Sequence, residues 1–225
     1  MTGERAAEEE QPGVRDVAAA GRTLAHPWLV SIVALLGFVA TTIAARQRPP
    51  PAFEVEVNRT INDVPAWIAD GLWPVMQLGT LWAPLVIAVI IGWWRRDRLL
   101  AVCLVIAGLF TWTTIRLLKE AVDRGRPSAY LDDVAVRDGV AKGLGFPSGH
   151  SATAAVIAVV CMAAVARPYR WVLVVVAAAV GIARIVHGVH LPADVIGGWS
   201  YGVIVGVATL AVYDGIRARR ARRPG

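Results

Sequence analysis

Long runs without a charged side chain constrain this chain more than any other feature of its sequence. Because a transmembrane helix needs about 20 mostly apolar residues, stretches free of Asp, Glu, Lys and Arg mark candidate spans. Six such stretches follow one another: 27–45, 71–94, 99–115, 151–166, 171–183 and 195–213. The sequence therefore predicts an all-α fold, a polytopic membrane protein built as a bundle of six transmembrane helices.

Composition supports a membrane-embedded domain. Hydrophobic residues make up 56% of the 225 residues, the mean hydropathy is +0.54 and the net charge is +6, whereas soluble domains contain roughly 45–50% apolar residues. The two cysteines, Cys103 and Cys161, lie inside apolar runs, which excludes a disulfide scaffold and a thiolate metal site. We predict a six-span domain over 26–215, a polar, mobile cytoplasmic tail over 1–25 and a basic cytoplasmic tail over 216–225.

The distribution of basic residues predicts how the chain crosses the membrane. Arginines are concentrated in both tails and in two turns between spans: Arg5, Arg15, Arg22, Arg95, Arg96, Arg98, Arg167, Arg170, Arg217, Arg219, Arg220, Arg222 and Arg223. With six spans these segments share one side, so the positive-inside rule makes both termini of this multi-pass plasma (inner) membrane protein cytoplasmic. The C-terminal arginines indicate topology and contact with anionic lipids rather than nucleic acid, because no groove-reading pattern accompanies them.

Three polar clusters interrupt the apolar chain at the same ends of spans three to six. The first follows the third span and contains Lys119 and Arg126. Taken alone, either cation is better explained as a side chain that snorkels to the interface. Arg184 differs, because at 1.5 Å per residue it lies about 20 Å along a helix that starts near Trp171. An arginine at that depth should face the bundle interior and needs an anionic partner.

The second cluster, Pro147-Ser148-Gly149-His150, runs directly into the fourth span. A turn of this kind leaves backbone N–H groups unpaired at a helix start, where the helix dipole also favours an anion. Taken alone, the segment is equally consistent with Ser148 as an ordinary N-cap and His150 as a solvated residue. A phosphate site at Ser148 and Gly149 is therefore one of two interpretations.

The third cluster surrounds His190 and Asp194. Because the residue before a proline is disfavoured in helical geometry, Pro192 should open the sixth helix, with His190 in the preceding turn. Asp194 then lies close enough to bond one imidazole nitrogen, which fixes the tautomer and leaves the other nitrogen as a nucleophile. Without the other clusters, a capping Asp194 beside an interfacial histidine would be the simpler interpretation.

In their order and spacing the three clusters resemble the signature of the type 2 phosphatidic acid phosphatase family. Its motifs are Lys-x6-Arg-Pro, Pro-Ser-Gly-His and Ser-Arg-x5-His-x3-Asp, and the segments 119–127, 147–150 and 184–194 match them. One departure is Ala183, which replaces the family's serine and removes a hydroxyl from the phosphate-binding groups without changing the nucleophile. His187 lies nearby, but the motif spacing selects His190.

The resemblance implies a lipid phosphatase that needs neither metal nor cofactor and works through a phosphohistidine. His190 would attack phosphorus, Asp194 would orient it, and His150 would act as general acid and base. The phosphoryl oxygens would be bound by Lys119, Arg126, Arg184, Ser148 and Gly149. No further Asp, Glu or His set with divalent-metal spacing is visible in the sequence, so we expect no metal site.

The position of the clusters favours a lipid phosphate as the binding partner, since a tail can stay in the bilayer while the headgroup enters an extracytoplasmic site. Our first choice is a polyprenyl (undecaprenyl or decaprenyl) diphosphate hydrolysed to the monophosphate. Phosphatidylglycerophosphate, phosphatidic acid and a phosphorylated prenyl sugar are the alternatives. Other membrane lipids are expected neighbours, no nucleic acid partner is expected, and the oligomeric state is left open.

Two other classes of function were weighed against the phosphatase. The family's relatives include vanadate-dependent haloperoxidases, but six membrane spans argue against that activity. A lipid transporter or headgroup-binding scaffold would also use cations, although transporters usually bind near the bilayer midplane between repeated halves. The sequence shows no repeated halves, and the pair His150 and His190 exceeds what headgroup binding requires.

Overall fold

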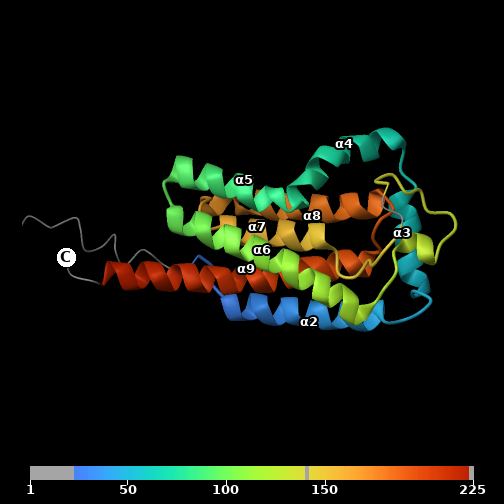
Figure 1. The fold of residues 1–225 in the computed structure, drawn as a ribbon, viewed down its shortest axis with the longest axis horizontal. Coiled ribbons are helices and arrows are strands. Elements are labelled where there is room, and N and C mark those ends of the chain that lie inside the picture. Colours follow the sequence, from blue (N-terminus) through green and yellow to red (C-terminus); the bar gives the residue numbers. More distant parts are fainter. Residues whose placement is uncertain (1–22, 140–141, 223–225) are drawn as a thin grey trace, which may run out of the picture.

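The chain folds into a bundle of helices, most of which run along the long axis of the molecule (Figure 1). The computed structural model describes residues 23–139 and 142–222, and their only β pairing is an isolated bridge between Gly125 and Leu144. The α-helices are α2 (Pro27–Ala45), α3 (Ala52–Asn62), α4 (Ala66–Met76), α5 (Trp82–Ile90), α6 (Arg98–Val122), α7 (Gly149–Cys161), α8 (Arg170–Val186) and α9 (Pro192–Ala221). Helix α3 lies across one end of the bundle.

The predicted spans agree with the helices in position and differ in their ends. The first span coincides with α2, while α6, α8 and α9 extend beyond the stretches predicted for them. Charged residues such as Arg116 and Arg184 end an uncharged stretch but remain inside a helix, which explains the extra length. Helix α9 continues to Ala221 through much of the predicted basic tail, whereas residues 1–22 and 223–225 lie outside the described residues.

The structure supports fewer than six independent spans by length. Four helices, α2, α6, α9 and Arg167–Val186, are long and apolar enough to cross a membrane, and the pair Ala66–Gly79 and Trp82–Arg95, bent by 72°, counts as a fifth if it forms one span. Helix α7 has only 13 residues. The six-span count therefore stays a prediction.

Helix α7 lies at the centre of the bundle, and this position explains its composition. All its residues from Ser151 to Cys161 are buried, and it packs on α6, α8 and α9. Gly202 of α9 permits the close approach, since a Cβ atom there would lie 2.2 Å from the Ala152 carbonyl oxygen. Because protein surrounds α7, it does not need the length that a lipid-exposed span requires.

The beginning and end of the described chain lie at the end of the bundle opposite α3 (Figure 1). Thr23 donates from its backbone N–H and its hydroxyl to Asp214 at 3.2 Å each. Arg170, at the start of α8, donates to the Thr23 carbonyl at 2.6 Å. Tyr213 near the end of α9 donates to Asp97 at the start of α6. The basic turns and the beginning and end of the described chain therefore gather at one end.

Candidate active site

The three polar clusters meet at the end of the bundle that α3 covers. Helices α6 and α8 run toward this end, whereas α7 and α9 start from it (Figure 1). Lys119 is in the last turn of α6, His150 in the first turn of α7, Arg184 in the last turn of α8 and Asp194 in the first turn of α9. Alternating helix direction thus brings together residues that are up to 75 positions apart (119 to 194) in the sequence.

His190 and Asp194 form a pair at the start of α9. Pro192 is the first residue of that helix, as predicted, and both side chains are buried. His190 Nδ1 lies 3.3 Å from Asp194 Oδ2, which also accepts the Leu191 backbone N–H at 3.0 Å. With the carboxylate ionised, Nδ1 carries the imidazole proton and Nε2 keeps a free lone pair.

Positive charges converge on His190. Burial, followed by the charges of Lys119, Arg184 and Arg126, lowers the pKa of the His190 imidazole well below its ordinary value of 6.5. The same three cations also interact electrostatically with His150. A histidine that stays neutral at physiological pH retains the lone pair that a nucleophile needs.

Arg184 is buried and has an anionic partner, as its depth in the helix predicted. Its exposed fraction is 3%, and Nη1 donates to Asp138 Oδ2 at 2.8 Å and contacts the Met76 sulfur at 2.8 Å. Its Nε atom is buried with no hydrogen-bond partner among the described residues. A buried guanidinium N–H without a partner is costly, and a bound anion would satisfy it.

Lys119 and Arg126 lie where the loop after α6 passes the site. Lys119 Nζ donates to the backbone oxygens of Leu144 and Gly145 at 2.7 and 2.9 Å. Arg126 Nη1 lies 3.5 Å from the Val189 carbonyl oxygen, directly before His190. Burial and then the charge of Arg184 lower the pKa of Arg126. Closely spaced cations repel each other, so this arrangement favours a multiply charged anion.

Ser148, Gly149 and His150 form the start of α7, where the structure agrees with the interpretation of Ser148 as an N-cap. Ser148 is the N-cap: its buried hydroxyl accepts the Ser151 backbone N–H at 3.4 Å and lies 3.0 Å from the Ser151 hydroxyl. Gly149 and His150 are half-buried. Gly79 packs against this turn so closely that a Cβ atom there would lie 2.7 Å from the His150 carbonyl oxygen.

Two charged residues at this end were not recognised as part of a site from the sequence. Arg124 and Glu54 are fully buried, and Arg124 donates to both carboxylate oxygens of Glu54, at 3.1 and 2.6 Å. Arg124 Nη1 also donates to Asp194 Oδ1 at 3.0 Å. Arg124 is only two residues before Arg126, but Glu54 belongs to α3 and no motif connects it to the site.

His187 does not belong to the pair of histidines that the motifs select. It is buried at the C-terminal end of α8, and its Nδ1 lies 2.7 Å from the Ala183 carbonyl oxygen. Ala183 itself is fully buried. Across 23–139 and 142–222, no group of three or more His, Cys, Asp or Glu side chains could hold a metal ion.

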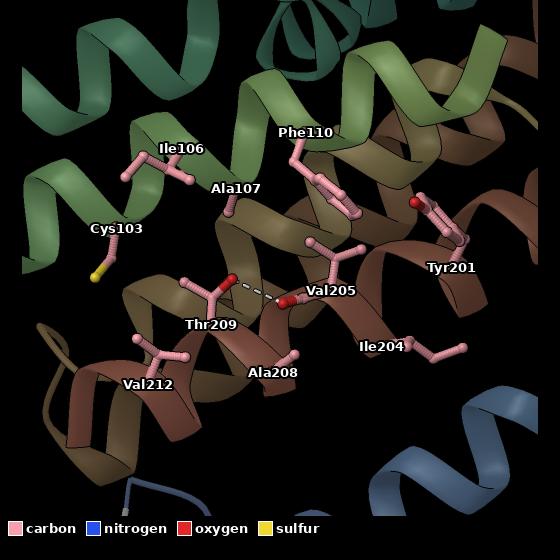
Figure 2. A pocket seen from close by; sticks show the side chains of 10 residues that line it. All are labelled: Cys103, Ile106, Ala107, Phe110, Tyr201, Ile204, Val205, Ala208, Thr209 and Val212. Carbon is pink, nitrogen blue, oxygen red and sulfur yellow. Dashed lines mark hydrogen bonds between the residues drawn. The ribbon is translucent and has the colours of Figure 1, made fainter. Parts of the chain in front are cut away.

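An apolar groove runs along the two helices that carry Lys119 and Asp194. Figure 2 shows its lining side chains, which come from α6 and α9: Cys103, Ile106, Ala107, Phe110, Tyr201, Ile204, Val205, Ala208, Thr209 and Val212. Its volume is about 520 Å³. Thr114 and Tyr201 form a hydrogen bond between the two helices at the end of the groove nearer the site. Both helices that line the groove are long and apolar enough to cross a membrane.

Comparison with known sequences finds one matching family model, described as the PAP2 superfamily, over residues 97–217. Among curated proteins, the chain is 32% identical over 117 residues to a lipid A 1-phosphatase of Rhizobium etli, covering 47% of this chain and 50% of that protein. A lipid A 1-phosphatase of Rhizobium johnstonii is 31% identical over 109 residues, covering 47% and 44%. The match thus spans about half the length of these relatives.

Two solved structures resemble most of this chain. Aquifex aeolicus LpxE superposes with a TM-score of 0.66 at 26% identity, covering 72% of this chain and 96% of that one. A transmembrane PAP2 type phosphatidylglycerolphosphate phosphatase from Bacillus subtilis superposes with a TM-score of 0.68 at 25% identity, covering 86% and 98%. The fold is therefore that of membrane phosphatases. Helix α3 lies before residue 97, where the match to the family model begins.

Proposed function

The chain belongs to the PAP2 superfamily, and on that basis we propose that it is a membrane lipid phosphatase acting through a phosphohistidine on His190. The observation that carries the proposal is the convergence of the buried His190 imidazole, its carboxylate partner Asp194 and three cations at one end of the bundle. The relatives named as lipid phosphatases support the same class of reaction.

In the proposed first step, His190 Nε2 attacks phosphorus while the bond between phosphorus and the leaving oxygen breaks. Asp194 accepts the hydrogen bond from Nδ1 and stabilises the positive charge that develops on the ring. Protonated His150 gives its proton to the leaving oxygen. Because the phosphoryl oxygens offset the nearby positive charges, substrate binding favours the protonated form of His150.

In the second step, water attacks the phosphohistidine and the phosphorus–nitrogen bond breaks. His150, now neutral, takes the proton from that water, which returns both histidines to their starting state and releases phosphate. Lys119, Arg126, Arg184, the Ser148 hydroxyl and the Gly149 N–H are assigned to the phosphoryl oxygens. They stabilise the transition state in place of a metal ion, so we propose that the reaction is metal-independent.

We assign the substrate to lipids that carry a phosphomonoester or diphosphate. The site lies at the ends of apolar helices, and the groove on α6 and α9 offers a surface for a tail of the same molecule. A polyprenyl diphosphate is our first choice, while the relatives make a lipid A 1-phosphate or phosphatidylglycerophosphate the second.

The arginines at the opposite end support an orientation for the protein in the plasma membrane. Arg95, Arg96 and Arg219 are exposed where the beginning and end of the described chain meet. By the positive-inside rule we propose that this end faces the cytoplasm and that the site is extracytoplasmic.

The test is release of phosphate by the detergent-purified protein from a panel of lipids, with and without EDTA. The panel contains farnesyl diphosphate, undecaprenyl diphosphate, phosphatidic acid, phosphatidylglycerophosphate and lipid A. We expect turnover of at least one lipid that EDTA leaves unchanged and that His190→Ala abolishes. Loss of turnover with EDTA and recovery with Mg²⁺ would contradict the mechanism, and wild-type protein inactive on every lipid would contradict the proposed function.

A further inference from the structure

The Asp194 carboxylate is held from two sides inside the protein. On one side it meets His190 Nδ1, at 3.3 Å. On the other side Arg124 Nη1 donates to its second oxygen at 3.0 Å. Asp194 and Arg124 have 0% exposed side chains, so neither water nor a lipid headgroup takes part in this contact.

Glu54 completes the arrangement from a helix that lies before the segment matched by the family model. Its carboxylate accepts two hydrogen bonds from Arg124, and Glu54 Oε1 also accepts the Ala193 backbone N–H at 2.8 Å. Its side chain is 1% exposed. Glu54 thus holds both the arginine and the first turn of the helix on which Asp194 lies.

The charge of Arg124 is strongly stabilised by these partners. Burial opposes the charged guanidinium, but the hydrogen bonds and charges of Glu54 and Asp194 together outweigh burial and raise the pKa of Arg124. Arg124 is thus a permanent cation shared by two buried carboxylates. Its position is therefore suited to fixing a neighbouring catalytic group.

We propose that Arg124 and Glu54 are positioning residues for phosphoryl transfer. Arg124 holds the Asp194 carboxylate where it accepts the proton on His190 Nδ1, and Glu54 holds Arg124. Neither residue touches the substrate, so both act through the tautomer and the orientation of His190. The inference rests on the proposed phosphohistidine chemistry for its kinetic consequence, while its structural consequence is independent of that chemistry.

The test uses four variants of the full chain: Arg124→Met, Glu54→Gln, the double variant and Arg59→Gln. Arg59 is the matched control, because it lies on the same helix as Glu54 and pairs with Asp133 at 2.8 Å on the surface. The double variant removes one buried positive and one buried negative charge together, so the net charge at this end of the bundle stays the same.

The first measurement is kinetic, with dioctanoyl phosphatidic acid and farnesyl diphosphate as substrates. We expect Arg124→Met and the double variant to lose about 10- to 100-fold in kcat, with KM nearly unchanged. The reason is that Arg124 orients Asp194, and through it His190, without binding the substrate. Glu54→Gln should lose less, and Arg59→Gln should match the wild type. Recovery of wild-type kcat in a stably folded double variant would overturn the proposal, because the pair would then be only a buried scaffold.

The second measurement is the tautomer of His190, read from ¹⁵N chemical shifts of protein labelled at its four histidines. We expect a single Nδ1–H tautomer in wild type and Arg59→Gln, and a mixture in Arg124→Met and in the double variant. An unchanged tautomer in the double variant would overturn the proposal. This reading does not depend on turnover, so wild-type protein that is inactive yet shows the tautomer change would contradict only the proposed function.

Discussion

Both ends of the helix bundle contain arginines, but arginines that are buried and paired at one end contrast with exposed arginines at the other. At the end covered by α3, Arg124 and Arg184 have exposed fractions of 0% and 3% and are paired with buried or half-buried carboxylates. At the opposite end, Arg95, Arg96 and Arg219 are exposed. Burying a charge is costly unless it is paired. The buried arginines at the α3 end therefore indicate a function, whereas solubility and topology explain the exposed arginines at the opposite end.

Residue type alone does not identify a functional cation. Exposed arginines at the end of a membrane helix interact with water and anionic lipids, and their contributions are screened by salt. Buried arginines keep most of their electrostatic strength, and they either pair inside the protein or bind an anion. The predictions below test this difference between the two ends.

The largest effect is expected within the α3 end, where two buried histidines lie three residues apart. His190→Gln should lower kcat by on the order of 10³-fold or more, because it removes the nucleophile. His187→Gln is the matched control and should retain most activity, since the His187 ring bonds a helix carbonyl. Steady-state phosphate release measures both, and substantial residual turnover in His190→Gln would move the nucleophile elsewhere.

A direct contrast between the ends comes from one substitution made at each. Arg184→Met should lower kcat/KM by roughly 100-fold, as expected when a buried donor to a transition state is lost. Arg219→Met should stay within about twofold, since at 1.5 Å per residue α9 separates it from Asp194 by about 38 Å. Equal losses in kcat/KM for the two variants would break the distinction between buried and exposed cations.

A smaller effect should follow from filling the groove between the ends. Ala208 lines it, and Ala208→Trp should reduce kcat/KM for a long-tailed lipid by roughly 3- to 10-fold through lost tail contact. A short-tailed analogue should be unaffected. Val174→Trp, at an exposed position of α8 outside the groove, is the control. A loss that is the same for both tail lengths would show that the groove does not bind the substrate tail.

The smallest effect concerns stability and pH at the buried end. Because the pKa of His190 is lowered in the fold, the unfolded chain binds a proton that the folded chain does not, from pH 6.5 downward. The free energy of unfolding should therefore fall as the pH drops below 6.5, by up to about 1.4 kcal/mol per pH unit for this group. Thermal unfolding at pH 7 and pH 5 should show a smaller loss in His190→Gln than in wild type. Equal losses would place the titration on another group.

Much of the fold and part of the candidate site were predictable from local patterns. The stretch 27–45 is a helix at the predicted ends, and Pro192 opens α9 with His190 just before it. The expected burial and anionic pairing of Arg184 agree with the structure, although Asp138 as the partner was not foreseen. Such features depend on residues within a turn or two, or on the cost of placing charge in a membrane.

Other features depend on contacts that no local pattern encodes. The predicted span 71–94 is interrupted by a 72° bend, and Gly79 at that bend packs against the turn at His150. Helix α7 is shorter than a span because its neighbours cover it. Glu54 is 70 residues of chain away from Arg124 and 139 away from Ala193, whose side chain and backbone N–H, respectively, donate to it.

By itself, the order of residues determined that this chain is helical, is embedded in a membrane and carries motifs with the chemistry of phosphate transfer. Hydrophobic runs and motif spacing are properties of neighbouring residues, so they can be recognised without coordinates. Only the tertiary structure decided which charges face each other, because pairing of Glu54, Arg124 and Asp194 requires two helices and a loop from three parts of the chain to meet at one end. Burial then makes those contacts strong, by removing the water that would otherwise screen them.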